Sequence, residues 1–216
     1  MKKIMFDDRH GLTKAVLEGR KTMTRRRIVP PRTMEGKDVY GFAVVKYPRT
    51  NQPIEVMALD ADGAQIGNIL PKYKVGEVVA VAQNLRDMGY APRDTKHRSG
   101  AIWGLDKSVA WTNKMYVTAS ECIHRIRITD VRIERLQDIR DEDCLKEGTY
   151  NWKDAPDCPK GQKESSIELF GFDGSWNGYF SPRDAFAALI DRICGKDTWK
   201  NNPYVFVYEF ELVEKH

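Results

Sequence analysis

Residues 122–134 read CIHRIRITDVRIE, and this stretch is predicted to form one long β-strand. Its apolar side chains change phase along the strand. Ile126 and Ile128 share one parity, whereas Val131 and Ile133 share the other. Because successive side chains of a strand point to opposite faces of the sheet, the change requires a bulge or a corner. Closed or strongly curved sheets need such corners, so the stretch predicts a barrel.

The remaining strands are expected to make the sheet mainly antiparallel. Residues 39–70 are typical of a β-meander, with Asp62-Gly63 as a hairpin turn. Short strands are predicted at residues 3–6 and 77–82. The last strand, 204–213, has an aromatic core face because every second residue is large and apolar: Tyr204, Phe206, Tyr208, Phe210 and Leu212.

About three helices are predicted to flank this sheet. The first ends at Gly19, and the second covers residues 136–146. The third begins at Ser181-Pro182, in the preferred order of cap residue and then proline, and ends at Gly195. The fold class is therefore α+β.

No internal repeat and no linker divides the chain, so residues 1–216 are predicted to form a single domain. Residues 85–110 are rich in Arg, Lys, Gly and Asp and are expected to form a loop. Residues 149–181 have no clear period but many aromatic residues, which indicates a packed loop with a lid as one candidate role.

The composition is ordinary for a globular protein, with 41% hydrophobic and 31% charged residues. No apolar run approaches the roughly 18 residues that span a bilayer, so we expect no membrane partner. In the segment MKKIMFDDRHGL at residues 1–12, the apolar run is too short for a secretory signal. A cytoplasmic location is therefore expected. An oligomeric state is not indicated.

The cysteine pattern favours reduced thiols. The four cysteines form no Cys-x-x-Cys pair and match no common zinc spacing: Cys122, Cys144, Cys158 and Cys194. We therefore expect no metal and no cofactor. A structural zinc built with His124 is the alternative.

Positive charge is concentrated near the N-terminus, although the net charge is only +4. Five of the eight residues from 20 to 27 are basic and none is acidic: Arg20, Lys21, Arg25, Arg26 and Arg27. Such a cluster predicts a phosphate-binding patch for a nucleotide or a nucleic acid. The alternative is a solvated charge run, in which Arg20 and Lys21 complement the carbonyl end of the first helix.

The segment LEGRKTMTRR at residues 17–26 resembles the G-R-K-T-x-T-R signature of ASCH domains, which are PUA-like β-barrels. Three other segments resemble the phage and prophage branch of that family: GEVV at 76–79, ITDVRIERLQDI at 128–139 and NPYVFVYEF at 202–210. The motifs recur in the family's order. The resemblance implies a barrel with a cleft lined by the Gly-Arg-Lys segment.

Compared with a minimal ASCH core, the chain is predicted to carry insertions at 35–70, 85–110 and 149–181. A further departure follows the Gly-Glu strand, where phage-type relatives usually have Val-Arg-Glu-Thr-Trp. This chain has VAQNL at 81–85, so Gln83 and Asn84 replace the family's residues. The departure implies a different ligand or weaker binding.

The family includes acetylcytidine amidohydrolases, which remove the acetyl group from the exocyclic amine of cytidine, as well as ribonucleases and RNA-binding modules. The resemblance to the amidohydrolases implies that Lys21, Thr24 and Glu147 are the catalytic residues. Glu147 follows from an ungapped alignment through residues 136–139, and Glu142 is the alternative. The implied ligand is a nucleoside, a nucleotide or RNA.

Amide hydrolysis needs a nucleophile, a proton donor for the leaving amine and stabilisation of the oxyanion. Our hypothesis makes Thr24 the nucleophile, Lys21 its base and Glu147 the proton shuttle. Lysine is a base only when it is neutral, which requires a pKa lowered from about 10.4 by burial or nearby positive charge. In a second version, Glu147 activates a water and Lys21 holds the oxyanion. The alternative is that the three residues have structural roles only. Lys21 would then be a charge at a helix end, Thr24 a β-branched strand residue and Glu147 a solvated helix terminus.

Tryptophans could stack a nucleobase, and the candidates are Trp103, Trp111, Trp152 and Trp176. Packing in the core or in loops is their alternative role. Three functions therefore compete: an amidohydrolase on an acylated nucleoside, a non-catalytic RNA-binding module that uses the arginines of residues 20–27, and a ribonuclease.

Overall fold

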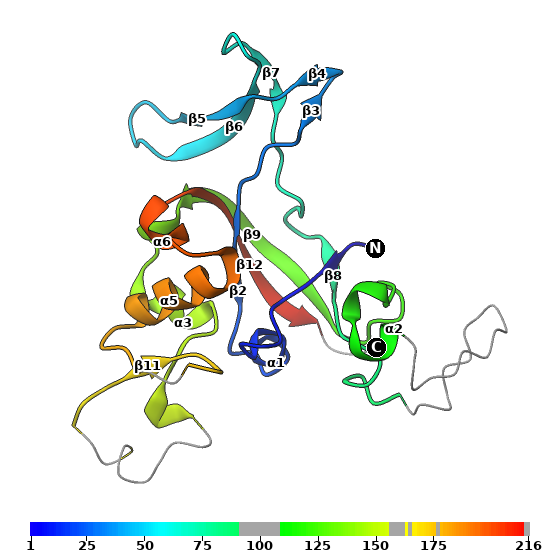
Figure 1. Ribbon diagram of the computed structural model, residues 1–216, viewed down its shortest axis with the longest axis vertical. Helices are drawn as coiled ribbons and strands as arrows, with labels where there is room; N and C mark the ends of the chain where they lie inside the picture. Colours follow the sequence, from blue (N-terminus) through cyan, green and yellow to red (C-terminus); the bar gives the residue numbers. More distant parts are fainter. Residues whose placement is uncertain (91–108, 156–162, 164–165, 176–177, 214–216) are drawn as a thin grey trace, which may run out of the picture.

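The structure, a computed structural model, describes residues 1–90, 109–155, 163, 166–175 and 178–213 of the chain. Within these residues the fold is α+β, as predicted (Figure 1). A five-stranded sheet with the strand order β1-β8-β9-β12-β2 forms its centre. In chain order its strands are β1 (Lys3–Ile4), β2 (Met23–Arg27), β8 (Val78–Val81), β9 (Arg125–Arg135) and β12 (Tyr204–Val213).

The central sheet is mostly antiparallel but open. Only β1 and β8 are parallel neighbours. β1 and β2 are the two edge strands, and no strand pairing within the described residues joins them. The chain entering β2 meets a helix end instead of another strand, because the amide of Thr22 donates a hydrogen bond to the carbonyl of Lys146. The predicted closed barrel is therefore not formed by the described strands.

The predicted phase change in β9 is a bulge. Phe210 of β12 pairs with Ile128, and the preceding residue, Glu209, pairs with Asp130, so Thr129 has no partner in the register. The extra residue moves the apolar positions of β9 from one parity to the other.

Strand β12 is buried on both faces. Phe206, Tyr208 and Phe210 lie in the main hydrophobic core, which confirms the predicted aromatic face at these three residues, whereas Leu212 is exposed. Val205 and Val207 are also buried, in a second cluster on the opposite face. That face is covered by helix α5 (Pro182–Cys194) and helix α3 (Asp141–Lys146), which contribute to the same cluster.

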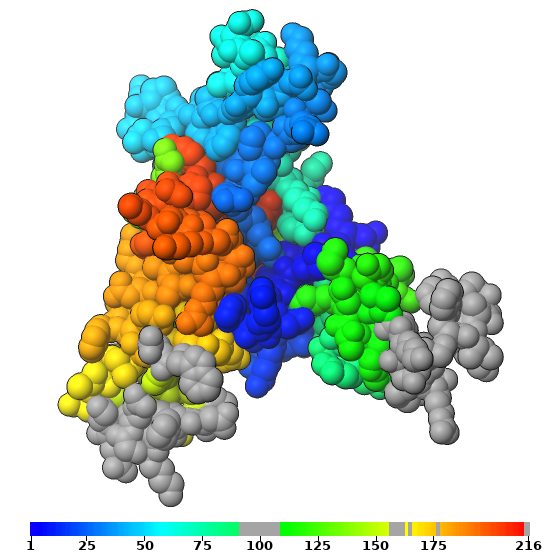
Figure 2. Space-filling view, in the orientation of Figure 1, coloured from blue at the N-terminus to red at the C-terminus, as the bar shows by residue number. Residues whose placement is uncertain are grey.

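A second sheet forms a separate lobe, visible at the top of Figure 2. It is the predicted meander β5-β6-β7, formed by β5 (Gly41–Lys46), β6 (Pro53–Leu59) and β7 (Gln65–Asn68). Two small two-stranded antiparallel sheets were not predicted: β3 (Thr33–Met34) with β4 (Lys37–Asp38), and β10 (Tyr150–Asn151) with β11 (Phe170–Gly171).

Five α-helices are described where about three were expected. The additional short helices are α2 (Val109–Thr112) and α6 (Thr198–Asn201). The predicted helix at 136–146 is divided into the 3₁₀ turn η3 (Leu136–Asp138) and α3, because Ile139 and Arg140 between them are extended. Two other 3₁₀ turns are η2 (Lys114–Tyr116) and η4 (Trp152–Asp154). None of the described helices has the length and apolar character required to cross a bilayer.

Candidate active site

Lys21 is placed by the end of helix α1 (Leu12–Leu17). The helix ends at Leu17, and Gly19, two residues later, has a φ of 73° in the left-handed region that favours glycine. The chain then folds back, and the Lys21 amide donates a hydrogen bond to the carbonyl of Ala15. Strand β2 starts two residues later, so Lys21 is fixed between a helix end and a strand. Its exposed fraction is 2%.

Glu147 is placed by the end of helix α3, where its amide donates to the carbonyls of Asp143 and Cys144. The next residue, Gly148, has a φ of 105°. A Cβ at Gly148 would lie 2.9 Å from Leu12 and 3.5 Å from Cδ of Lys21. Glycine is therefore required there by the backbone and by the close approach of α1 to the lysine side chain.

Lys21 and Glu147 form a buried ion pair. The Lys21 Nζ lies 2.8 Å from Oε2 of Glu147 and also donates a hydrogen bond of 2.6 Å to its carbonyl oxygen. The two side chains are 1% and 5% exposed. This contact joins two residues that lie 126 positions apart in the chain and that the sequence had singled out together. Glu142, the alternative, is exposed on α3.

Burial lowers the pKa of Lys21 below the usual 10.5. The carboxylate of Glu147 opposes this effect, and the positive charges of Arg26 and Arg25 add to it. The direction is the one that a lysine base requires.

Thr24 is buried on the face of β2 that looks into the aromatic core. It pairs with Tyr208 of β12, and directly opposed residues of an antiparallel pair share a face. Its exposed fraction is 5%, and its hydroxyl makes no hydrogen bond to any residue that the structure describes. Lys21 and Glu147 are therefore brought together, whereas neither is hydrogen-bonded to Thr24.

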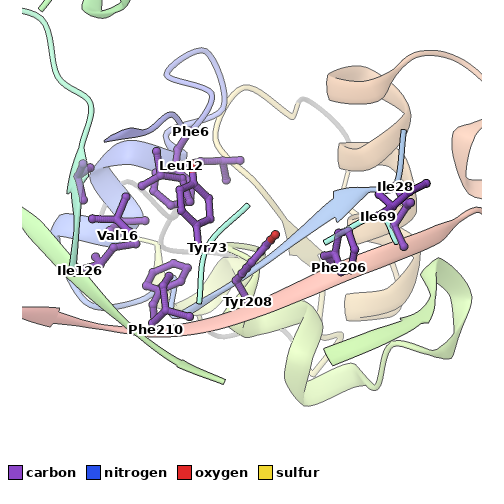
Figure 3. Packing of buried hydrophobic residues seen from close by; sticks show 14 of the residues in the cluster. Phe6, Leu12, Val16, Ile28, Ile69, Tyr73, Ile126, Phe206, Tyr208 and Phe210 are labelled. Atoms are coloured by element: carbon purple, nitrogen blue, oxygen red, sulfur yellow. The ribbon is translucent and has the colours of Figure 1, made fainter. Parts of the chain in front are cut away.

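Phe6 covers this part of the sheet (Figure 3). Its ring lies 5.7 Å from the Lys21 Nζ and 5.7 Å from the guanidinium carbon of Arg26, measured to the ring centroid. Its carbonyl accepts a hydrogen bond from Lys114, which ties the segment after β1 to η2. Because Lys21, Thr24 and Glu147 are all buried, the site is closed in this structure.

The predicted phosphate-binding arginines have different environments. Arg25 is buried and bonded to carboxylates, so it is not available to a phosphate. Arg20 bonds Glu18 and lies 5.9 Å from the ring of Tyr150. Arg26 and Arg27 are exposed, and Arg26 donates to the carbonyl of Met5.

The two residues at which the sequence departs from the ASCH-type pattern are inside the protein. Gln83 and Asn84 are 4% and 5% exposed. The Gln83 side-chain oxygen lies 2.6 Å from Nδ1 of His124, and the Asn84 amide contacts Asp87. Within the described residues no three His, Cys, Asp or Glu side chains are grouped as metal ligands, so the zinc alternative has no ligand set there.

Of the candidate stacking residues, Trp111 and Trp152 are half-buried in α2 and η4. Trp103 and Trp176 lie outside the described residues, as does Cys158. Cys122 and Cys144 are buried thiols, and Cys194 is an exposed one.

A pocket of about 280 Å³ lies where the two sheets meet. Its lining combines apolar residues of both sheets: Ile54, Val56, Ile69, Leu70, Ile133 and Phe206. No predicted site residue contributes to it.

Sequence reasoning missed the carboxylates around Arg25. Glu134 of β9 and Asp143 of α3 both contact its guanidinium. The strand alternation was an available signal, since Arg25 has the same parity as the buried Met23. Comparisons of the chain with protein-family models, with curated proteins and with solved structures found no match.

Proposed function

We propose that the protein is an amidohydrolase of the ASCH type, which removes the acyl group from the exocyclic amine of an acylated nucleoside. The buried Lys21–Glu147 ion pair carries the proposal. An ion pair withdrawn from water is costly to maintain, and it is weak evidence for stability alone. A buried lysine whose pKa is lowered is typical of catalytic sites. We also propose that the open central sheet is a variant of the PUA-like barrel.

The pair supplies both the base and the acid of the reaction. The ammonium of Lys21 transfers its proton to Glu147, which leaves a neutral amine. The amine takes the hydroxyl proton of Thr24 as the threonine oxygen attacks the acyl carbonyl. When the C–N bond breaks, the proton on Glu147 goes to the leaving amine. The acyl group is then on Thr24, and the Lys21–Glu147 ion pair is restored.

A water molecule completes the cycle by the same transfers. Lys21 passes its proton to Glu147 and takes one from the water, which attacks the acyl-threonine. Glu147 returns its proton to the threonine oxygen, and the carboxylic acid leaves. In the alternative route, Glu147 activates a water directly and Lys21 stabilises the oxyanion. Detection of an acyl group bound to Thr24 would distinguish the two routes, because only the first route forms an acyl-threonine.

The test is the turnover of N4-acetylcytidine by the purified protein, followed by liquid chromatography. We expect cytidine and acetate in equal amounts, at a rate that changes little with salt. If no cytidine forms from this nucleoside, alone or within an RNA strand, the proposal is wrong.

The RNA-binding alternative rests on the exposed side chains of Arg26 and Arg27. It predicts an affinity for RNA that falls with salt, with a log–log slope near one for each phosphate contact. Because Arg25 is buried and bonded to carboxylates, fewer arginines can contact phosphates, and the expected slope is small. A ribonuclease would instead shorten the RNA, which a denaturing gel detects.

A further inference from the structure

The carboxylate of Glu147 is held at both of its oxygens. Lys21 Nζ lies 2.8 Å from Oε2, and Nη1 of Arg25 lies 3.1 Å from Oε1. Both cations come from one segment of chain, since Lys21 precedes β2 and Arg25 is part of it. The acidic partner of the pair is therefore fixed by two groups, of which only the first belongs to the mechanism above.

Arg25 is itself fixed from two other elements. Its Nε and Nη2 lie 2.9 Å and 2.5 Å from Oε1 of Glu134 on β9. Its Nη2 also lies 3.6 Å from Asp143 on α3. The side chain is 1% exposed. A planar guanidinium bonded on several sides cannot rotate, so it presents Nη1 to Glu147 in one direction.

We propose that Arg25 is the positioning residue of the Lys21–Glu147 pair: it occupies Oε1 of Glu147 and so directs Oε2 to the lysine. This inference deepens the proposed function and rests on it. With Oε1 occupied, protons enter and leave the carboxylate through Oε2, on the side where Lys21 lies. Arg25 does not touch the substrate in this scheme.

The charges around Lys21 give the expected direction of a titration. Lys21 faces the carboxylate of Glu147 from the end of α3 and the cations of Arg25 and Arg26 from β2. Removing Arg25 removes a positive charge and leaves Lys21 as the one cation in contact with Glu147 among the described residues. Both changes favour the ammonium form, so the pKa of Lys21 rises. In the mechanism above the Lys21–Glu147 pair carries one proton, and the rate falls at alkaline pH where Lys21 loses that proton. The alkaline limb of the rate profile therefore moves to higher pH.

The kinetic test compares Arg25→Met, Arg25→Lys and the control Arg132→Met. Arg132 is the matched control because it bonds Glu134 and contacts Asp143 but does not contact Glu147. For Arg25→Met we expect kcat to fall by about ten-fold or more with KM changed less than about two-fold, and the alkaline limb to move up by about one pH unit. Arg25→Lys restores the limb and part of kcat.

Three results would overturn the inference. These are a wild-type kcat and pH profile in Arg25→Met, a change confined to KM, and equal losses in Arg132→Met. If Arg25→Met does not fold, Arg25→Lys is compared with Arg132→Lys. We then expect kcat to fall by about three-fold or more in the first variant alone, because a lysine cannot bond two carboxylates in the arginine's geometry. Equal kcat values in both variants would contradict the assignment.

A second readout does not depend on the substrate. The Cε resonance of Lys21 in protein with ¹³C-labelled lysine, assigned by its loss in Lys21→Met, reports the pKa of Lys21 directly. We expect it to rise by about one unit in Arg25→Met and to stay near the wild-type value in Arg132→Met. If the wild type does not hydrolyse the nucleoside, the proposed function fails and this titration alone decides the role of Arg25. An unchanged Lys21 pKa in Arg25→Met would reject it.

Discussion

Two buried cations at the edge of β2, Lys21 and Arg25, share the buried carboxylate of Glu147. Glu147 bonds both Lys21 and Arg25, and each of the three side chains is at most 5% exposed. Removing one member of such a group has a different effect depending on which charge is left without a partner. The variants of this cluster are therefore not equivalent, and their order of stability follows from the contacts.

Glu147→Gln is expected to destabilise the protein more than Lys21→Met does. The first change leaves the buried Lys21 facing a neutral amide, while Arg25 keeps Glu134, and such an uncompensated buried charge costs about 3–5 kcal/mol. The second leaves Glu147 bonded to Arg25, and methionine fills the volume of the lysine stem. Urea unfolding at neutral pH measures both variants. A larger loss for Lys21→Met would show that Glu147 does not neutralise both cations.

The pH dependence of stability tests the lowered pKa of Lys21. Its pKa in the folded protein lies below the usual 10.5, so between the two values the unfolded chain binds a proton that the folded protein does not. The free energy of unfolding of the wild type, relative to Lys21→Met, therefore rises with pH through this window and levels off above 10.5. Denaturant titrations at a series of alkaline pH values measure the difference. A relative stability that falls with pH would mean that the ion pair raises the pKa.

The identities of the residues alone did not show that Arg25 is buried whereas Arg26 and Arg27 of β2 are exposed. The resemblance named Lys21, Thr24 and Glu147 as site residues, and the structure adds that Glu147 lies against Lys21. The signature segment also suggested that Arg25 binds phosphate, because a run of arginines carries no information about which face of a strand each occupies. Only the pairing with β12 and the approach of Glu134 settle that.

At the scale of elements, sequence signals with a direct steric or hydrogen-bonding cause predicted local structure correctly. The phase change in β9 corresponds to the bulge at Thr129, and Ser181-Pro182 begins α5. The predicted helix at 136–146 was wrong in its middle. Buried Ile139 adopts an extended conformation there, which helical spacing of apolar residues does not exclude. Sheet closure depends on which segment meets β2, and no pattern within β2 contains that information.

Helix α5 provides the clearest test of a local signal. The Ser181 hydroxyl oxygen accepts a hydrogen bond of 3.0 Å from the amide of Asp184, as an N-cap does. Ser181→Ala is expected to reduce the free energy of unfolding by about 1 kcal/mol, whereas Ser181→Asp retains most of it. Thermal unfolding of the two variants gives the comparison. Equal losses for alanine and aspartate would indicate that the cap contributes nothing.

At the scale of the whole molecule, one hydrophobic core joins the two sheets. The cluster contains Val56 and Ile66 of the small sheet as well as Ile126 and Tyr208 of the central sheet. The segment at 35–70, predicted as an insertion, thus shares its core with the part that holds the candidate site. A shared core makes the two sheets unfold together.

Ile66→Ala and Ile126→Ala are therefore expected to shift the same transition. Each removes a buried side chain from this core and should cost about 2–5 kcal/mol. Denaturation followed by far-ultraviolet circular dichroism and by tryptophan fluorescence should give coincident curves for both variants. Two separated transitions, with only the first moved by Ile66→Ala, would mean that the lobe folds independently.

The central claim is that the Lys21–Glu147 pair is a catalytic centre, and the most direct measurement is kcat on N4-acetylcytidine for Lys21→Met beside the wild type. The exposed Lys14 of α1 supplies the matched control, Lys14→Met. We expect Lys21→Met to lose about a hundred-fold or more in kcat while it remains folded, and Lys14→Met to be unchanged. A folded Lys21→Met protein with the wild-type kcat would contradict the claim.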